Sequence, residues 1–378
     1  MKILCFADLH VGQKAYCKID PESGLHLREI NAIKILNKII DDAISNNVDV
    51  VVFAGDMFKN NLPNPTLINK VSEAFLKLSL NKIHTLILDG NHDVSKLNSF
   101  SSGLHQFVSL NIPFISQTRF YEEKLITIND NIYRFVFLPT HHTKEEIEEL
   151  VSNLDDKYKT IIIGHLTMKN ANLNDWNVID NDECIDKNIF KKKNIISVIL
   201  GHLHKHQILE REPLIFYCGS ADRIDFSEEK QDKGYVCLNF DNDSCDIDFI
   251  PIDISQKFLT LEFDYKKESD AETIENSIIK KLSKQNLKDV ILRIKLKLND
   301  GIKINEKRII EYAYKEKHVQ FLLKIQYEIE NIEDNKIEIS NSLPTFDAIE
   351  MYYDGQNRAD ERIKLCKDVV ERVENNVS

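Results

Sequence analysis

Five short clusters of Asp, Asn and His side chains carry the chemistry that this sequence offers. In chain order they are Asp8-Leu9-His10, Gly55-Asp56, Gly90-Asn91-His92-Asp93, Gly164-His165 and Gly201-His202-Leu203-His204. Most follow an apolar run typical of a β-strand, so we expect them to meet at the carboxyl ends of strands. Mixed nitrogen and oxygen ligands without thiolate favour Mn, Fe or Zn over Ca or Mg. The clusters therefore predict two divalent metal ions, and such a pair hydrolyses phosphate esters.

The spacing within the clusters suggests how the ligands divide between the ions. Side chains two residues apart at a strand end point the same way, so Asp8 and His10 can bind one ion together. Asp56 directly follows an apolar run, and Gly55 permits close backbone approach, so the Asp56 carboxylate can bridge both ions. We expect one ion among Asp8, His10, Asp56 and His204, and the other among Asp56, Asn91, His165 and His202.

The third cluster also contains a candidate proton donor. Cleavage of a phosphodiester leaves an alkoxide that needs a proton, and His92 can supply one from beside the metals without ligating them. Asp93 could orient the His92 ring, or it could equally be a carboxylate that caps the turn. His92 and Asp93 are therefore the candidate catalytic residues.

The elements that must position these clusters alternate between strands and helices through residues 1–255. Apolar runs predict strands at Lys2–Ala7, Val48–Ala54, Ile83–Leu88, Tyr133–Leu138, Thr160–Ile163 and Ile195–Leu200, and apolar spacing predicts helices at Arg28–Asn46, Pro65–Leu80 and Lys144–Asn153. Residues 214–250 indicate several strands and no clear helix. This pattern predicts an α/β fold with two packed sheets flanked by helices.

The remainder of the 378 residues has a different rhythm, as expected for a chain too long for one core. Strict alternation at 290–298 and again at 319–327, with helical spacing between, predicts a small α+β domain over 256–342. Residues 343–378 read as two amphipathic helices that lack an obvious core of their own, which favours binding in a partner's groove.

Composition limits the setting of the protein. The net charge of −12 argues against a sequence-blind DNA binder that relies on its own basic face, although two bound cations would change the local field. The seven scattered cysteines form no CxxC pair and fit a reducing compartment. The sequence contains no run of 18 apolar residues that would predict a membrane span, and the N-terminus leads straight into a strand without room for a cleavable signal. We therefore expect a cytoplasmic protein.

The five clusters in this order resemble those of the calcineurin-like metallophosphoesterases, and in particular the SbcD-type nucleases of double-strand-break repair. The segment Asp8–Gly12 looks like the family's DxHxG start, and Gly55–Phe58 looks like its GDxF segment. Gly164–Thr167 and Leu200–Gln207 fit its later histidine motifs. The stretch from Tyr217 to Glu228 resembles the family's Y-x-G-S…R…F…E pattern, with Cys218 where many relatives place Pro or Ser.

The resemblance implies a fold, an activity and partners. It implies a two-sheet metallophosphoesterase domain at 1–255, a small α+β capping domain at 256–342, and a helical tail at 343–378 that docks on an SMC-like (SbcC-type) coiled-coil ATPase. It also implies Mn²⁺-dependent exonuclease and endonuclease cleavage of DNA, and a homodimer formed by helices of the phosphoesterase domain.

Two alternatives stay open at this point. The chain could be a calcineurin-like phosphodiesterase that acts on a small nucleotide, although the added domain and tail favour a nuclease. It could also be an inactive scaffold that kept the fold, although the complete ligand set and His92 argue against this.

Overall fold

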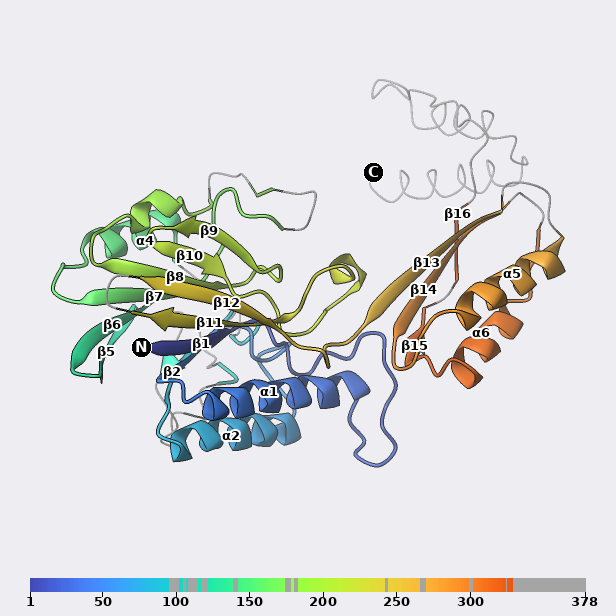
Figure 1. Cartoon of the computed structure of the whole chain (residues 1–378), viewed down its shortest axis with the longest axis horizontal. Helices are drawn as coiled ribbons and strands as arrows, with labels where there is room; N and C mark the ends of the chain where they lie inside the picture. Colours follow the sequence, from blue (N-terminus) through green and yellow to red (C-terminus); the bar gives the residue numbers. More distant parts are fainter. Residues whose placement is uncertain are drawn as a thin grey trace, which may run out of the picture.

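Two six-stranded sheets pack face to face, with helices on their outer sides (Figure 1). The computed structural model describes residues 1–94, 102–104, 107, 115–116, 121–138, 142–173, 178–179, 183–241, 244–265, 270–298, 302–323 and 325–328. The two packed sheets confirm the α/β sandwich that the alternating pattern predicts.

The first sheet has the strand order β12-β11-β1-β2-β3-β4. Its parallel strands are β1 (Lys2–Phe6), β2 (Val50–Ala54), β3 (His84–Leu88) and β4 (Ile115–Ser116), and its antiparallel strands are β11 (Gly234–Phe240) and β12 (Cys245–Pro251). The first three strands of the chain are thus neighbours, so the loops that follow them emerge at one edge.

The second sheet has the strand order β5-β6-β7-β8-β10-β9. Its parallel strands are β6 (Asn131–Leu138), β7 (Lys159–His165), β8 (Ile195–Gly201) and β10 (Leu214–Tyr217), with β5 (Glu122–Ile128) and β9 (Gln207–Arg211) antiparallel at the edges. The sequence predicted β7 and β8 within a few residues, because both are continuous apolar runs buried on two faces.

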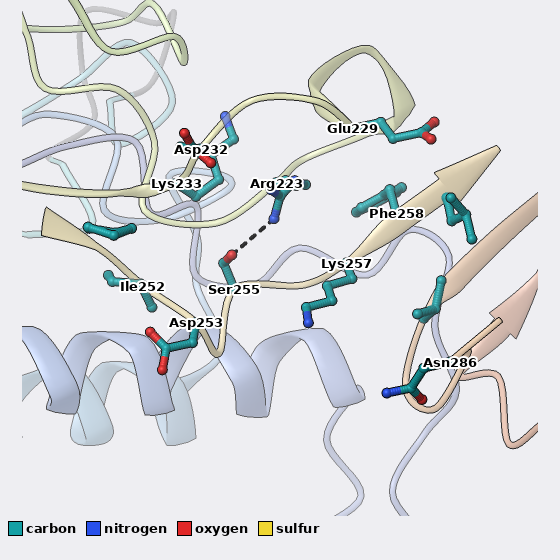
Figure 2. Close-up of a pocket in the computed structure, with 13 residues that line it drawn as sticks. Arg223, Glu229, Asp232, Lys233, Ile252, Asp253, Ser255, Lys257, Phe258 and Asn286 are labelled. Carbon is teal, nitrogen blue, oxygen red and sulfur yellow. Dashed lines mark hydrogen bonds between the residues drawn. The ribbon is translucent and has the colours of Figure 1, made fainter. Parts of the chain in front are cut away.

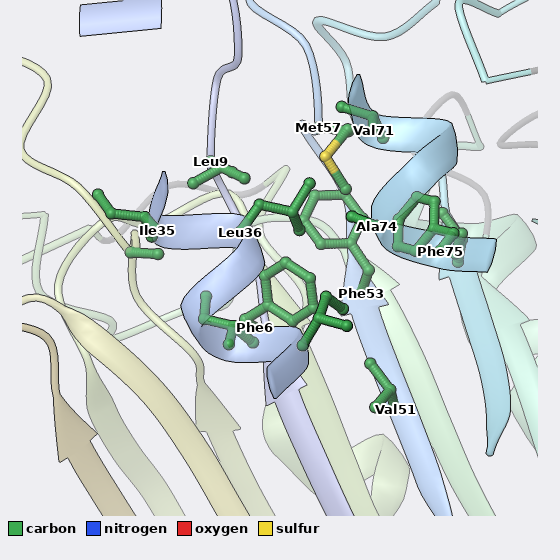
Figure 3. Packing of buried hydrophobic residues seen from close by; sticks show 14 of the residues in the cluster. Phe6, Leu9, Ile35, Leu36, Val51, Phe53, Met57, Val71, Ala74 and Phe75 are labelled. Carbon is green, nitrogen blue, oxygen red and sulfur yellow. The ribbon is translucent and has the colours of Figure 1, made fainter. Parts of the chain in front are cut away.

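Alternating side chains of each strand supply two different cores. In β1, Leu4 and Phe6 pack against α1 (Leu27–Ser45) and α2 (Pro65–Leu80), as Figure 3 shows for Phe6. Ile3 and Cys5 point the other way, into the core between the sheets. A third core lies under α4 (Lys144–Ser152) and the short helix η1 (Lys187–Phe190), on the outer face of the second sheet.

A third sheet, to one side of the sandwich, has its own core (Figure 1). Its parallel strands are β13 (Phe258–Tyr265), β14 (Ile291–Leu298), β15 (Phe321–Leu322) and β16 (Gln326–Glu328), covered by α5 (Ala271–Ser283) and α6 (Glu306–Lys315). The alternation at 319–327 gives two short strands where the pattern suggested one. Arg293 and Lys295 of β14 contact Thr260 and Glu262 of β13, so this basic row is partly neutralised within its own sheet.

The tail predicted at 343–378 lies outside the described residues. In the described part of the chain, no helix is both long and apolar enough to span a membrane.

Candidate metal centre

The loops after β1 and β2 are joined by backbone hydrogen bonds. Asp8 N donates to Gly55 O at 2.9 Å, and His10 N donates to Asp56 O at 3.0 Å. Asp8, His10 and Asp56 all have positive φ angles of 49–61°, a conformation that side chains other than glycine adopt at a cost. The paired loops hold this backbone shape, and it turns the three side chains toward the second sheet.

The first group of ligand atoms comprises Asp8, His10 and His204, whose donor atoms lie within 4.8 Å of one another. His10 Nε2 lies 3.2 Å from His204 Nε2 and 3.7 Å from Asp56 Oδ2. Asp8 and His10 are almost completely buried. With Asp56, these are the four residues that the sequence assigned to one ion.

The second group gathers around His165 at the end of β7. His165 Nε2 lies 3.3 Å from Asp56 Oδ2 and 3.1 Å from Asn91 Oδ1, and His202 Nδ1 lies 3.2 Å from the same Asn91 oxygen. Asp8 Oδ1 is also within 3.9 Å of His165 Nε2. Asp56 Oδ2 therefore faces both groups, which is the geometry that a bridging carboxylate requires.

Hydrogen bonds on the outer side of two imidazole rings fix which nitrogen faces the centre. His165 Nδ1 lies 2.8 Å from Ala54 O, and because a carbonyl only accepts, Nδ1 carries the proton. His204 Nδ1 lies 2.7 Å from Glu228 Oε1 in the same way. In the neutral state of each ring, Nε2 would therefore present its lone pair to the centre, as metal-binding histidines do.

Glu228 and Lys233 support His204, and sequence reasoning gave neither a role. Lys233 Nζ lies 2.6 Å from Glu228 Oε2 and donates to the backbone oxygen of His204 at 3.0 Å. Glu228 belongs to the stretch Tyr217–Glu228 that resembles the family, and this resemblance could have indicated a role for it. Nothing in the local sequence shows that Lys233 is buried beside it.

Burial and mutual charge shift the pKa values of the centre in opposite directions. Burial raises the pKa of Asp8 to about 6, whereas burial together with the adjacent His165 ring lowers the pKa of His202 to about 4. Burial alone would lower the pKa of His165, but the carboxylates of Asp56 and Asp8 raise it to about 9. Burial works against ionisation of Asp56, yet its His165 partner holds its pKa well below the usual range. Without a cation, protons balance the charge of the centre.

Two glycines make the close packing of these loops possible. A Cβ on Gly55, whose φ is +96°, would lie 2.2 Å from His165 Nδ1. A Cβ on Gly90 would lie 2.0 Å from Asp56 Oδ1. Glycine is therefore required at both positions for His165 and Asp56 to approach each other.

His92 lies next to the first group, with its ring edge-to-face on His10 at 4.9 Å between centroids. His92 Nδ1 lies 3.1 Å from Lys59 O, so a backbone carbonyl orients the ring, and Nε2 is the nitrogen that remains for proton transfer. His92, His10 and Asp56 also form a group of potential ligands within 4.8 Å.

Asp93 does not contact the His92 ring through its carboxylate. Its two oxygens accept hydrogen bonds from the backbone N–H groups of Met57, Phe58 and Gly90 at 2.8–3.1 Å. Of the two roles that the sequence left open for Asp93, these contacts favour the second, in which Asp93 caps the loops that carry Asp56 and Asn91. A fully buried carboxylate with three amide donors satisfies backbone groups that would otherwise be unpaired.

The donor set fits divalent cations. The His10 and His204 Nε2 atoms face each other at 3.2 Å, and two neutral imidazole lone pairs at that distance repel unless a proton or cation lies near them. Carboxylate, amide and imidazole donors from five loops converge, and none is a thiolate. The residues present can therefore hold two ions that share Asp56.

Two facing mixed sheets with such a centre at the carboxyl ends of their strands define a metallophosphoesterase sandwich. The family model of the calcineurin-like phosphoesterases matches residues 1–206. The chain belongs to this family.

The chain is also similar to individual proteins. The chain is 28% identical over 284 residues to a protein of Staphylococcus saprophyticus that is named as the D subunit of the nuclease SbcCD, covering 70% of this chain and 73% of that one. It is 27% identical over 285 residues to the protein of the same name from Staphylococcus epidermidis, with the same coverage. A crystal structure of a dimetal phosphatase from Danio rerio covers 66% of this chain and 95% of its own, with a TM-score of 0.42 and 10% identity.

Proposed function

We propose that this protein is a metal-dependent nuclease that cleaves DNA phosphodiesters as an exonuclease and an endonuclease. The observation that carries the proposal is the convergence of two donor groups on the shared Asp56 carboxylate. The names of the two staphylococcal relatives support a nuclease over a small-nucleotide phosphodiesterase.

We assign metal binding and proton donation to different residues of the site. Asp8, His10, Asp56 and His204 would hold one divalent ion, and Asp56, Asn91, His165 and His202 the other, with Mn²⁺ the proposed metal. Such ions, when bound, lower the pKa of a water molecule and neutralise charge on the phosphate. His92, oriented by Lys59 O, donates a proton from Nε2 to the leaving oxygen.

The proposal extends to the assembly. Residues 1–255 would form the nuclease domain, 256–342 a capping domain, and 343–378 the helices that bind an SMC-like ATPase. Two copies would pair as a homodimer in the cytoplasm, and the ATPase would supply much of the grip on DNA that a chain of net charge −12 lacks.

The test is cleavage of end-labelled duplex and hairpin DNA with Mn²⁺, compared with a small phosphodiester dye, with and without the partner ATPase. We expect Mn²⁺-dependent cleavage of both DNA substrates. Hydrolysis of the dye alone, with both DNAs intact in the presence of the partner, would favour the small-nucleotide enzyme and contradict the proposal.

A further inference from the structure

One short segment, Phe226–Glu229, connects the metal-ligand candidate His204 to the third sheet. It comprises the 3₁₀ turn η2 (Phe226–Glu228) and the next residue. Glu228 and Glu229 are consecutive, yet Glu228 binds His204 in the sandwich and Glu229 binds Thr260 on β13. The two contacts lie one peptide bond apart.

The inner contact holds His204 through both its ring and its backbone. Glu228 Oε1 lies 2.7 Å from His204 Nδ1, and Glu228 Oε2 lies 2.6 Å from Lys233 Nζ and accepts a hydrogen bond from Ile224 N at 3.1 Å. Lys233 in turn donates to His204 O. The side chains of Glu228 and Lys233 are 6% and 0% exposed, so water screens this ion pair little.

The outer contact is bidentate. Glu229 accepts hydrogen bonds from Thr260 N at 2.8 Å and from Thr260 Oγ1 at 2.6 Å. Arg293 on β14 donates to the same hydroxyl at 2.9 and 3.0 Å, and its guanidinium lies over the ring of Phe226 at 4.3 Å. The segment therefore contacts β13, at the edge of the third sheet, and β14 beside it.

Aromatic side chains also pack between the segment Phe226–Glu229 and the third sheet. Phe226 lies edge-to-face on Phe258 at 4.9 Å, and both rings contact Tyr16 from the loop after β1. Figure 2 shows Glu229 and Phe258 among the residues that line a pocket, together with Arg223, which is hydrogen-bonded to Ser255. The volume of this pocket is about 510 Å³. The segment shares the connection between sandwich and third sheet with Tyr16, which also contacts Phe321, and with Gln256, which donates to Asp289 O.

We propose that Glu228 and Glu229 are positioning residues through which the placement of the third sheet sets the orientation of His204 and hence the affinity of its metal group. This inference rests on the proposed function, because it assumes a divalent ion at His204. A ligand that shifted β13 would change metal affinity, and by linkage metal binding would change affinity for that ligand.

The test is titration of the full-length, metal-free protein with Mn²⁺ by calorimetry. For Glu229→Ala we expect one of two sites to weaken by about threefold to tenfold, the range typical of residues that act through others, and the second site to keep its affinity. Thr260→Val removes the hydroxyl that contacts both Glu229 and Arg293 but keeps the hydrogen bond from Thr260 N to Glu229, and it should weaken the same site by a smaller factor.

Two further variants separate position from charge. In Glu229→Gln the side-chain oxygen can still accept from Thr260 N while the charge is removed, so affinity should fall by less than in Glu229→Ala. Glu262→Ala removes an equal charge from the same strand, where Glu262 pairs with Lys295 at 3.3 Å, and it should leave both sites unchanged.

Thermal unfolding of each metal-free variant provides the second readout. A merely structural role for Glu229 would lower the unfolding temperature without selecting one metal site, and this result would overturn the inference. Equal affinities for Glu229→Ala and wild type would also overturn it, as would equal weakening by Glu262→Ala. Failure of the wild type to bind Mn²⁺ at all would instead contradict the proposed function on which this inference rests.

Discussion

His10 Nε2 and His204 Nε2 face each other at 3.2 Å although 194 positions of sequence separate the two residues. His10 follows β1 of the first sheet and His204 follows β8 of the second, so the contact crosses the interface of the sandwich. A centre built in this way depends on the packing of two sheets, and on the loops that fix each side chain.

Replacement of His92 by Ala should leave two Mn²⁺ ions bound and lower DNA cleavage by about 10²–10⁴-fold, the usual contribution of a general acid. The reason is that Lys59 O holds the ring beside His10 while both ligand groups are complete without it. Metal stoichiometry and single-turnover cleavage check this. Loss of one ion would make His92 a ligand, and unchanged cleavage would remove it from the mechanism. The exposed His84, at the opposite end of β3, provides the control variant His84→Ala.

Gly90→Ala should disrupt both metal groups, because the new Cβ would lie 2.0 Å from Oδ1 of the shared Asp56. We expect loss of Mn²⁺ binding and a fall of about 1–3 kcal/mol in the free energy of unfolding, typical of an overpacked site. Calorimetry and urea unfolding measure the two effects. Gly103→Ala is the matched control, since its nearest atom is Pro63 Cδ at 3.1 Å. Full Mn²⁺ occupancy in Gly90→Ala would show that the Asp56 loop can move aside.

The sequence predicts the parts of this centre that depend on residue type and strand ends, and it does not predict the parts that depend on tertiary contacts. The convergence of the seven metal-ligand candidates was predictable, because each lies at or just after the end of a strand and parallel strands bring such ends to one edge. The partners of Asp93 were not, because Met57 and Phe58 contribute backbone N–H groups that no side-chain pattern reveals. The buried Lys233 is a similar case, since only the fold shows that Glu228 neutralises it.

The fold shows the same division. Buried parallel strands such as β2 and β8 were predictable within two residues, because short continuous apolar runs are typical of strands covered on both faces. The segment at 319–327 alternates as one strand would, yet β15 and β16 are separate short strands that both pair with β14. Alternation reports which face is buried and does not report where pairing is interrupted.

A chain that ends at residue 342 should stay folded and lose its ATPase partner. The three sheets and their cores all lie before residue 329, so the deletion removes none of their described contacts. Circular dichroism should give an unchanged unfolding temperature, and a pull-down with the partner should show no retained complex. Undiminished binding would contradict the assignment of 343–378 as the docking helices, whereas an unfolded product would show that these residues stabilise the body.

Metal binding should release protons, and its affinity should rise with pH. In the metal-free fold the pKa of His165 is raised to about 9, from about 6.5 for a free imidazole. Protonation of His165 therefore stabilises the metal-free fold fully below pH of about 6.5, and this stabilisation is lost as the pH rises through about 9. A metal ion needs the neutral ring, so at pH 7.5 binding must displace the proton that Asp56 and Asp8 retain on His165.

Calorimetric titration with Mn²⁺ in buffers of different ionisation enthalpy counts these protons. We expect at least about one proton released at pH 7.5, and a larger number below pH of about 6, where Asp8 also holds a proton because burial raises its pKa to about 6. His165→Asn should reduce the release at pH 7.5. A release from His204 should remain, because its contact with Glu228 raises its pKa against the effect of burial, and so should the additional release at lower pH. Binding heats that do not depend on the buffer would show that His165 is neutral before the metal arrives, and that the charge of Asp56 and Asp8 is balanced in another way.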